Sequence, residues 1–519
     1  MKIEMGIYDA PRKAERGFFT IDTWRDNVAI FGDDGFGKTT FIKMLLYAVQ
    51  SVNGVAKADK KKHREKCFIL DFNADMGAFS KLGSVIAYFD NSNEEHIRSL
   101  FHIVDMYVSD NAEKLGGMNY QAFAEKHPDE VPDHYTLVID GVNSFLLDEK
   151  YIKYHEKLEE FCRDGQSKGL NVVITANNLS GISGRFMANF KQKVAFAMSD
   201  DDYYNVFNSR VEKPMRIKGR CLANTGSDIY ETQIFLPFAD KNFDKVLEGQ
   251  VERLGINPVY YYMFPSTITM ENITTYLSRA KQHEKEIPVG VAYRYHAPLV
   301  ANIDAYRTVA VYGSKAQTNS KLNLIGGLLD RIPDVDRNAR YVFLEDRRNI
   351  LGDLYEKHSG RSLKADSIEE FFGLLSQYGY IDTMRTDADG NEFVIPVQEN
   401  PFTVFLMQSR DIYQSSSKAA NLIRMLKEDL SVRAHANNYM FIFTDVQIMD
   451  YPQDFNDMID VAYLFDDIYD VVAGQGKKTV FGNLDERELK NEYARNAKGD
   501  GYYYNIQDDR LLKAKFIQF

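Results

Sequence analysis

Four residues near the start of the chain have types and a spacing that suit the binding of a nucleoside triphosphate. Gly32, Gly37, Lys38 and Thr39 fill the pattern G-x-x-x-x-G-K-[ST]. In such a loop the glycines let backbone N–H groups close around the α- and β-phosphates, at the positive end of the following helix. The lysine reaches the β- and γ-phosphates, and the threonine hydroxyl is placed to bind Mg²⁺. We therefore expect a site for ATP and Mg²⁺ here.

The flanks of this loop are those of a strand and a helix. Residues 28–31 form a short apolar run, and residues 41–49 are apolar at most positions, as in a packed helix. Gly35, Phe36 and Thr40 complete the set of expected nucleotide contacts. A glycine-rich turn that only joins a strand to a helix is the alternative. The complete pattern with both flanks favours phosphate binding.

A second motif supplies an acidic group. Residues 135–140 (YTLVID) form an apolar stretch that ends in Asp140, which is typical of a Walker B strand whose carboxylate holds the water shell of Mg²⁺. Many nucleotide hydrolases place a glutamate next, which orients the attacking water, but here the next residue is Gly141. Because no base follows the aspartate, we expect ATP to be bound well and hydrolysed slowly.

Other polar residues are candidates for acting on the γ-phosphate. Asn177 follows an apolar strand, where its side chain could sense that phosphate, although a simple turn explains it equally well. Arg185, Arg210 and Arg220 are candidates for an arginine finger that reaches the nucleotide of a neighbouring subunit. For each arginine the alternative is a surface ion pair.

The composition limits the class of protein. At 519 residues the chain exceeds what one core usually supports, so two or three domains are expected. A formal net charge of −12 argues against a surface shaped for nucleic acid, although a basic inner channel is compatible with that total. Cys67, Cys162 and Cys221 lack a metal-binding spacing, so we expect them to be buried and reduced. Because no apolar run approaches 18 residues, we expect a soluble chain.

Strands and helices alternate along the chain, and the pattern occurs twice. The alternation predicts an α/β fold with mostly parallel central sheets flanked by helices. The same offset of 281 separates Gly32 from Gly313 and Phe238 from Phe519. We therefore predict two tandem P-loop NTPase domains. Their expected ranges are 1–240 for the domain with the intact loop, 241–289 for a connector and 290–519 for a second, degenerate domain.

The second copy lacks the residues that bind phosphate and metal. Thr318 and Asn319 stand where the first copy has its second glycine and its lysine, and Gln408 replaces the metal aspartate. We expect no ordinary binding of Mg-ATP here, unless Lys315 or Lys321 substitutes from another position. A fold that is kept without its catalytic task is most simply explained by a binding role.

Several segments carry a resemblance to a known family. GIYDAPRKAERG, NVAIFGDDGFGKTTF, FILDFNADMGAF and LVIDGVNSF resemble the FtsK/SpoIIIE-type ATPase domains of type VII (ESX-like) secretion motors, the EssC/EccC family. The second copy, from IPVGVAYRYHAPLVANI onward, resembles the degenerate terminal ATPase domain of the same motors. Two departures bear on hydrolysis: Gly141, and Tyr203, which lies near the place where DNA-pumping relatives carry an arginine finger.

This resemblance implies a role in protein export. It implies the C-terminal cytosolic part of a membrane-anchored motor, whose transmembrane segments and first ATPase domain lie upstream, at the cytoplasmic face of the bacterial cell membrane. Such a motor uses ATP to export small helical WXG-type proteins, so the expected partners are these proteins and other secretion subunits. The full-length motor is expected to form a hexamer and this fragment a monomer, with no nucleic acid bound.

Two alternatives stay open. An FtsK-like DNA translocase should have one intact ATPase core, basic channel loops and a C-terminal winged-helix domain. A nucleotide-binding scaffold with little hydrolysis would need only the intact first loop, and the sequence does not separate it from a slow motor.

Overall fold

The structure of the chain is a computed structural model that divides into two compact units, Met1–Met263 and Phe264–Phe519. The residues that it describes are 2–10, 13–58, 65–199, 202–225, 228–237, 247, 249, 264, 267–277, 285–303, 305–344, 350–378, 384–386, 392–394, 401–409, 438–445, 453–475, 478–479, 482–483, 493, 495–505 and 510–519. Among these residues no helix has both the length and the apolar character that a membrane span requires.

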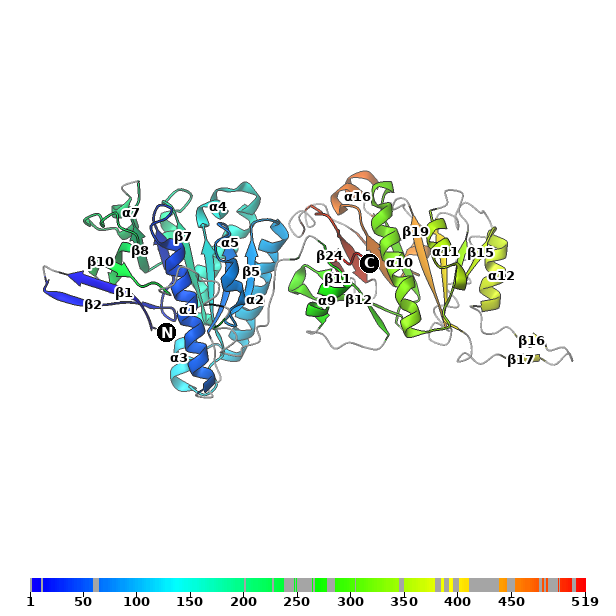
Figure 1. Cartoon of the computed structure of the whole chain (residues 1–519), viewed down its shortest axis with the longest axis horizontal. Helices are drawn as coiled ribbons and strands as arrows, with labels where there is room; N and C mark the ends of the chain where they lie inside the picture. The colour runs from blue at the N-terminus through cyan, green and yellow to red at the C-terminus, as the bar shows by residue number, and fades with distance from the viewer. Residues whose placement is uncertain are drawn as a thin grey trace. The chain divides into compact units, whose positions relative to one another are not determined.

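The first unit is built on one ten-stranded sheet (Figure 1). Its strands are β1 (Lys2–Ala10), β2 (Glu15–Asp22), β3 (Val28–Phe31), β4 (Glu65–Asp71), β5 (Val85–Asp90), β6 (His134–Asp140), β7 (Leu170–Ala176), β8 (Gln192–Phe196), β9 (Arg220–Thr225) and β10 (Asp228–Ile234). They lie in the order β2-β1-β10-β9-β8-β3-β7-β6-β4-β5. The six strands from β8 to β5 are parallel, and the other four are antiparallel.

Helices cover both faces of this sheet. They are α1 (Lys38–Ala58), α2 (Glu94–Leu115), α3 (Tyr120–Lys126), α4 (Val142–Leu147), α5 (Ile152–Asp164), α6 (Gly184–Met187) and α7 (Tyr203–Phe207). Alternate residues of β3 serve two separate cores, as the pleat of a strand requires. Val28 and Ile30 pack in the core that contains α1, whereas Ala29 and Phe31 pack in the core that contains α2 and α5.

The second unit repeats this architecture. Its main sheet contains β11 (Glu286–Ala292), β12 (Pro298–Asn302), β13 (Thr308–Tyr312), β14 (Arg340–Leu344), β15 (Ser362–Ala365), β18 (Thr403–Gln408), β19 (Tyr439–Asp445), β20 (Val461–Leu464), β23 (Asp500–Asn505) and β24 (Arg510–Phe516). The order is β12-β11-β24-β23-β20-β13-β19-β18-β14-β15, which matches the first sheet strand for strand. The predicted fold class, two tandem α/β units with mostly parallel central sheets, is therefore confirmed.

The remaining elements of the second unit are short strand pairs and helices. The pairs are β16 (Met384–Thr386) with β17 (Glu392–Val394) and β21 (Lys478–Thr479) with β22 (Gly482–Asn483); the helices are α9 (Met270–Leu277), α10 (Thr318–Val335), α11 (Gly352–Lys357), α12 (Ile368–Tyr378), α15 (Gln453–Asn456) and α16 (Ile468–Gln475). The stretch 241–289, which we expected to connect the domains, contains α9 and the first residues of β11. Both belong to the second unit.

The order of the strands decides where the polar residues of the first unit meet. In parallel strands the carboxyl ends share one edge of the sheet, and the loops that follow them form the usual ligand site of such folds. The loop of Gly32 follows β3, while Asp71 and Asp140 end β4 and β6 and are partners in register. β7 lies between β3 and β6 and brings Thr175 to the same edge. All three cysteines are buried and unpaired, as expected.

Candidate nucleotide-binding site

The loop after β3 has a backbone that only glycine adopts readily. The φ angles of Gly32, Gly35 and Gly37 are +151°, +81° and +130°. A Cβ atom on Gly32 would lie 2.7 Å from the Cβ of Phe196, and one on Gly37 would lie 3.0 Å from the ring of the same residue. The three glycines therefore let the loop curl tightly over β8 before α1 begins at Lys38.

Lys38 is held inside this loop. Its side chain is buried, and its Nζ donates to the carbonyl oxygen of Gly32 at 2.6 Å. The same ammonium lies 3.1 Å from a carboxylate oxygen of Asp34, whose side chain is 86% exposed. A buried ammonium therefore lies within the loop, paired with a carboxylate that faces solvent.

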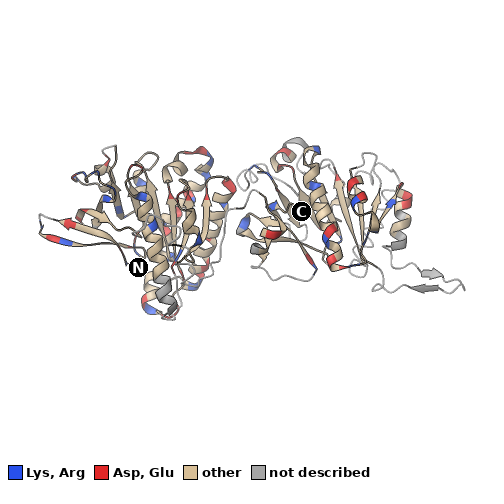
Figure 2. Cartoon of the chain, in the orientation of Figure 1, with Lys and Arg blue, Asp and Glu red and all other residues tan. Residues whose placement is uncertain are grey.

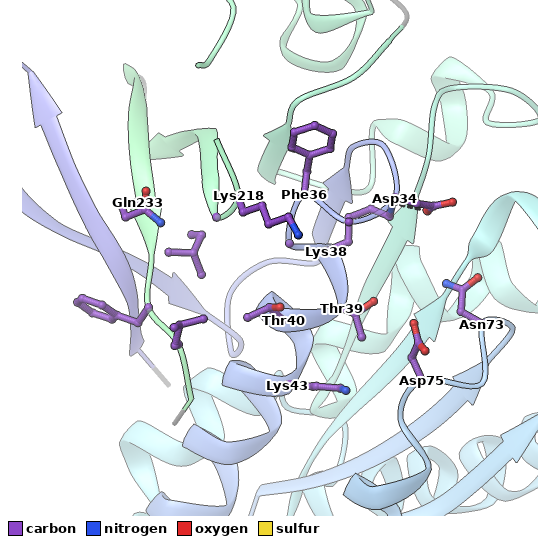
Figure 3. A pocket seen from close by; sticks show the side chains of 16 residues that line it. Asp34, Phe36, Lys38, Thr39, Thr40, Lys43, Asn73, Asp75, Lys218 and Gln233 are labelled. Atoms are coloured by element: carbon purple, nitrogen blue, oxygen red, sulfur yellow. Dashed lines mark hydrogen bonds and ion pairs between the residues drawn. The ribbon is translucent and has the colours of Figure 1, made fainter. Parts of the chain in front are cut away.

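A cavity of about 790 Å³ opens beside the loop (Figure 3). This volume lies within the usual range of small-molecule sites, roughly 300 to 1,000 Å³. Its lining residues are Asp34, Gly35, Phe36, Gly37, Lys38, Thr39, Thr40, Lys43, Asn73, Asp75, Lys218, Gly219, Gln233, Ile234, Phe235 and Leu236. Six of the seven loop residues expected from the sequence thus line one cavity. The seventh, Gly32, accepts the hydrogen bond from Lys38.

Asp140 is buried at the end of β6, and each of its two carboxylate oxygens accepts one hydrogen bond. Thr175 Oγ1 donates to one carboxylate oxygen at 2.5 Å, and Asn73 Nδ2 donates to the other at 3.0 Å. Burial raises the pKa of Asp140 above its ordinary value, against the opposing effects of the two hydrogen bonds and of the Lys38 ammonium. Asn73 also lines the cavity, so it links the aspartate to the ligand space.

The residue after this aspartate is constrained by its backbone. Gly141 has a φ of +85° and caps α4, and its N–H donates to Thr175 Oγ1 at 2.7 Å. An added Cβ would lie 3.2 Å from the Cβ of Phe72 and 3.3 Å from the side-chain amide of Asn73. A glutamate at this position would therefore be strained as well as crowded.

The predicted sensor residue lies at the end of β7. The Asn177 backbone N–H donates to Asn143 Oδ1 at 2.8 Å, and its side chain is exposed. Asn143 also donates to the carbonyl oxygen of Ser180 at 2.8 Å, so it fixes the turn that follows β7. Asn177 is not among the described residues that line the cavity.

The three candidate arginine fingers differ in their distance from the loop along the chain, and Arg220 directly follows Gly219, whose N–H donates to the carbonyl oxygen of Phe36 in the loop. Arg185 is on α6, where its side chain is 80% exposed and its Nε lies 3.6 Å from a carboxylate oxygen of Glu159. Arg210 is exposed beyond α7, and Arg220 is half-buried at the start of β9. None of these arginines is among the described residues that line the cavity.

Sequence reasoning missed one arginine that touches the loop. Arg216 lies with its guanidinium 4.9 Å from the ring centre of Phe36 and 3.3 Å from a carboxylate oxygen of Asp33. Although burial opposes it, hydrogen bonds from Ser199 and Arg216 lower the pKa of Asp33. Tyr203 is buried nearby and donates to the carbonyl oxygen of Phe196 at 3.2 Å. The sequence feature that could have indicated a nearby cation was the negative charge of Asp33 within the loop.

The loop of the second unit carries a negative charge at one of its amides. The N–H of Ser314 donates to an Asp466 carboxylate oxygen at 2.7 Å, whereas the corresponding N–H of the first unit, that of Asp33, donates to the carbonyl oxygen of Ala197 at 2.8 Å. A 3₁₀ turn, Lys315–Gln317, precedes α10. The buried Lys321 donates to the carbonyl oxygen of Asp445. Lys321 is therefore committed to the interior.

The metal position of the second unit is also changed. Gln408 pairs in register with Thr444 on β19, at the equivalent places to Asp140 and Thr175. Gln408 Oε1 and Thr444 Oγ1 are buried and have no hydrogen-bond partner within the described part of the chain. The hydrogen bond that fixes the acid in the first unit is absent from these described residues.

A cavity of about 610 Å³ occupies the corresponding place beside α10. The hairpins behind the two cavities match: Ile234 N donates to the carbonyl oxygen of Gly219 at 2.9 Å, and Phe516 N donates to that of Gly499 at 3.0 Å. The second cavity is lined mainly by amide and aromatic side chains, with Lys498 as its cation. It offers no cation at the position of Lys38, where Asn319 stands.

The donor set of the first unit fits Mg²⁺ carried by a nucleotide. Among the described residues there is no cluster of three or more His, Cys, Asp and Glu side chains that could hold a metal ion alone. Mg²⁺ usually binds through one or two protein oxygens together with waters and phosphates. The hydroxyl of Thr39 in the cavity and the fixed carboxylate of Asp140 beside it suit that mode.

Comparisons with known proteins agree with the resemblance seen in the motifs. No family model matches the chain. The type VII secretion system protein EssC of Staphylococcus aureus (strain MRSA252) is 19% identical over 309 residues, which cover 56% of this chain and 20% of the relative. The ESX secretion system protein EccC of Geobacillus thermodenitrificans is 24% identical over 357 residues, which cover 64% of this chain and 23% of that relative. The chain thus spans less than a quarter of these relatives' length.

Solved structures match over the whole chain. ATPases 2 and 3 of EssC from Geobacillus thermodenitrificans align with all of this chain and 96% of that one, at a TM-score of 0.69 and 17% identity. ATPases 2 and 3 of EccC from Thermomonospora curvata, in complex with a signal sequence peptide, align with all of this chain and 93% of that one, at a TM-score of 0.52 and 14% identity. The chain is thus a homologue of the EssC/EccC ATPases of type VII secretion systems and has the fold of their second and third ATPase domains.

Proposed function

We propose that this chain is the C-terminal ATPase portion of a type VII secretion motor. In this proposal the first unit binds ATP with Mg²⁺, and the second unit binds an exported protein or another part of the machinery. The observation that carries the proposal is the cavity of the first unit, in which Lys38, Thr39 and the glycine loop converge beside the buried Asp140.

The contacts of the cavity suggest how the nucleotide lies. The phosphates fit against the loop, where Lys38 exchanges its exposed partner Asp34 for phosphate oxygens and keeps its bond to Gly32. Thr39 would be a ligand of Mg²⁺ and Asp140 would hold its water shell, and the metal ion would neutralise phosphate charge when bound with the nucleotide. The far wall, formed by residues 234–236 at the end of β10, is apolar and suits the base.

Hydrolysis in this unit is slow or depends on a partner. The left-handed backbone at Gly141 and the close contacts that a Cβ would make disfavour the glutamate that commonly orients water. Arg185, Arg210 and Arg220 are exposed or half-buried and do not line their own cavity, which is compatible with action on the nucleotide of a neighbouring subunit in a hexamer of the full-length motor. The fragment alone is proposed to be monomeric.

The second unit is proposed to bind protein rather than nucleotide. Its loop amide at Ser314 is already paired with Asp466, and Lys321 is committed to Asp445. The homologous EccC of Thermomonospora curvata was solved with a signal sequence peptide. By analogy, we propose that the C-terminal tail of a WXG-type protein is the ligand, bound with its apolar face in a groove.

Charge argues against the DNA translocase alternative. The chain carries a formal net charge of −12, and basic and acidic residues are interspersed along the described elements of both units (Figure 2). Binding to the DNA backbone depends on clustered lysine and arginine. The scaffold alternative, in which nucleotide is bound but not turned over, predicts the same ligands and differs only in hydrolysis.

Three titrations of the whole chain test the proposal. Calorimetry with Mg-ATP should give saturable binding, and a labelled WXG-type tail peptide should bind, whereas duplex DNA at physiological salt should not. Absence of Mg-ATP binding would refute the role of the first unit. Salt-sensitive binding of DNA without binding of the peptide would assign the chain to the translocase class.

A further inference from the structure

Asp75 is a second acidic residue of the nucleotide cavity, and neither the motifs nor the relatives' names assign it a role. It lies in the turn between β4 and the 3₁₀ helix Gly77–Lys81 and lines the same cavity as Lys38 and Thr39. Figure 3 shows its side chain projecting from that turn into the space beside Thr39. A carboxylate therefore faces the place where the proposed function puts the γ-phosphate, and the inference below rests on that function.

The turn that carries this residue is held rigidly. One buried carboxylate, that of Asp71, accepts from the backbone N–H of Asn73 at 3.2 Å, from the N–H of Met76 at 2.8 Å and from the Tyr88 hydroxyl at 2.9 Å. Between the two anchored amides, Ala74 has a φ of +57°, a left-handed conformation that costs free energy for any residue but glycine. The anchoring fixes the direction in which the next side chain points.

The carboxylate of Asp75 is uncommitted, unlike the other acids near the cavity. Asp34 is ion-paired with Lys38, and Asp140 accepts from Thr175 and Asn73. Asp75 is exposed and makes no hydrogen bond or ion pair with any described residue. Its oxygen lone pairs are therefore available to a water molecule in the cavity.

We propose that Asp75 orients and deprotonates the water that attacks ATP, the role left vacant by Gly141. The water oxygen forms a bond to the γ-phosphorus while the bond from that phosphorus to the β–γ bridging oxygen breaks. ADP leaves with the electron pair of the bridging oxygen, and the proton of the water passes to the Asp75 carboxylate and then to solvent. Asn73, on the same turn, is a positioning residue because it ties this loop to Asp140.

Single-turnover hydrolysis of labelled ATP, with the whole chain in excess, tests the proposal. Asp75→Asn keeps the shape of the side chain and removes its basicity, so the rate should fall by about 100-fold, the usual contribution of a general base. Because the carboxylate supports no contact of the fold, the variant should bind Mg-ATP in calorimetry as the wild type does. Asp75→Glu should recover part of the rate.

A matched control is available on the neighbouring strand. Asp90 ends β5 beside Asp71, caps the next turn through Ser92 and does not line the cavity, so Asp90→Asn should hydrolyse at the wild-type rate. The hydrolysis rate of Lys38→Ala, which lacks the proposed phosphate cation, serves as the background rate. Wild-type hydrolysis no faster than this background, or Asp75→Asn turning over at the wild-type rate, overturns the role of Asp75. A wild-type chain that fails to bind Mg-ATP refutes the proposed function instead.

Discussion

Lys38 couples the loop to its ligand through a single ammonium group. In the structure this group bonds to the Gly32 carbonyl and to the exposed Asp34, so a phosphate can take the place of the second partner while the bond to Gly32 is kept. Charge-assisted hydrogen bonds of this kind contribute about 1.5 to 3 kcal/mol. The lysine is thus both a support of the loop and the proposed phosphate cation.

We predict that Lys38→Ala weakens the binding of Mg-ATP by roughly ten- to a hundredfold. Isothermal titration of the whole chain measures the change. Lys43→Ala is a suitable control, because Lys43 lines the same cavity from the next turn of α1 but stands outside the motif. Equal affinities of the wild type and Lys38→Ala would mean that the loop has a structural role only.

A second prediction for a single residue concerns Asp140. Its proposed role in holding the metal needs the charged carboxylate, which burial destabilises. Burial raises its pKa in the folded chain, so keeping it ionised at neutral pH costs stability. Asp140→Asn removes the charge and keeps an oxygen that accepts from Thr175, and its amide nitrogen can donate to Asn73 once the exposed Asn73 amide turns its oxygen inward. We therefore expect a melting temperature at neutral pH at least as high as that of the wild type, together with loss of the Mg²⁺ dependence of ATP binding.

The pH dependence of this difference follows from the sign of the shift. A group whose folded pKa is raised contributes stability in acid and loses that contribution as the pH rises through its folded pKa. The stability advantage of Asp140→Asn should therefore be largest at neutral pH and disappear as the pH is lowered and the wild-type carboxyl becomes protonated. Thermal melts from neutral to acidic pH measure it, and an advantage that grows in acid would contradict the assignment.

At the scale of elements, the hydroxyl of Thr175 joins the ends of β6 and β7. It donates to Asp140 and accepts from the N–H of Gly141, so one buried atom fixes both the metal acid and the start of α4. In sheets of this kind ligands bind at the carboxyl ends of the parallel strands. One hydroxyl thus links the last residue of β6 to the residue that caps α4.

Thr175→Val should cost about 1 to 3 kcal/mol, because it leaves a buried carboxylate oxygen and a backbone N–H without partners. It should also weaken Mg²⁺-dependent binding of ATP, because the acid is no longer oriented. Denaturant unfolding and titration with and without Mg²⁺ measure the two effects.

Thr136→Val is the matched control for this element. Thr136 is also buried on β6, but its hydroxyl donates to Asn171 at 2.7 Å, away from the site. It should cost similar stability and leave nucleotide binding unchanged. If both valine variants bound Mg-ATP as the wild type does, the junction would have no part in the site.

At the scale of the whole chain, two sheets of identical strand order carry different chemistry. The first loop presents a buried ammonium to a cavity, whereas the second loop is paired with Asp466 and faces a cavity with Asn319 at the equivalent position. Loss of charge complementarity removes phosphate affinity while the packing of the sheet is kept. The two units should therefore bind different ligands.

We predict that one ATP binds per chain and that Lys38→Ala weakens binding at this single site without changing the stoichiometry. Calorimetric stoichiometry of the wild type and the variant measures both statements. The reverse control is Asn319→Lys, which restores the motif lysine but leaves Asp466 and Gln408 in place and should not create a second site. A stoichiometry of two in the wild type would show that the second unit binds nucleotide.

The sequence by itself determined the features that depend on local patterns. The glycine spacing around Lys38, the apolar run that ends in Asp140 and the repeated alternation of strands and helices indicate two tandem α/β units. These signals are short-range, because a loop that wraps phosphates and a strand that feeds it must be contiguous in the chain. The replacements Asn319 and Gln408 were visible for the same reason.

Only the tertiary structure decided which distant residues join the site. Thr175, Asn73 and Arg216 reach the loop or its acid because the strand order brings their segments to one edge of the sheet, and no local pattern encodes that order. The freedom of the Asp75 carboxylate and the commitment of Lys321 to the interior likewise depend on burial and on partners. Such properties arise from packing between segments far apart in the sequence, which residue spacing does not reveal.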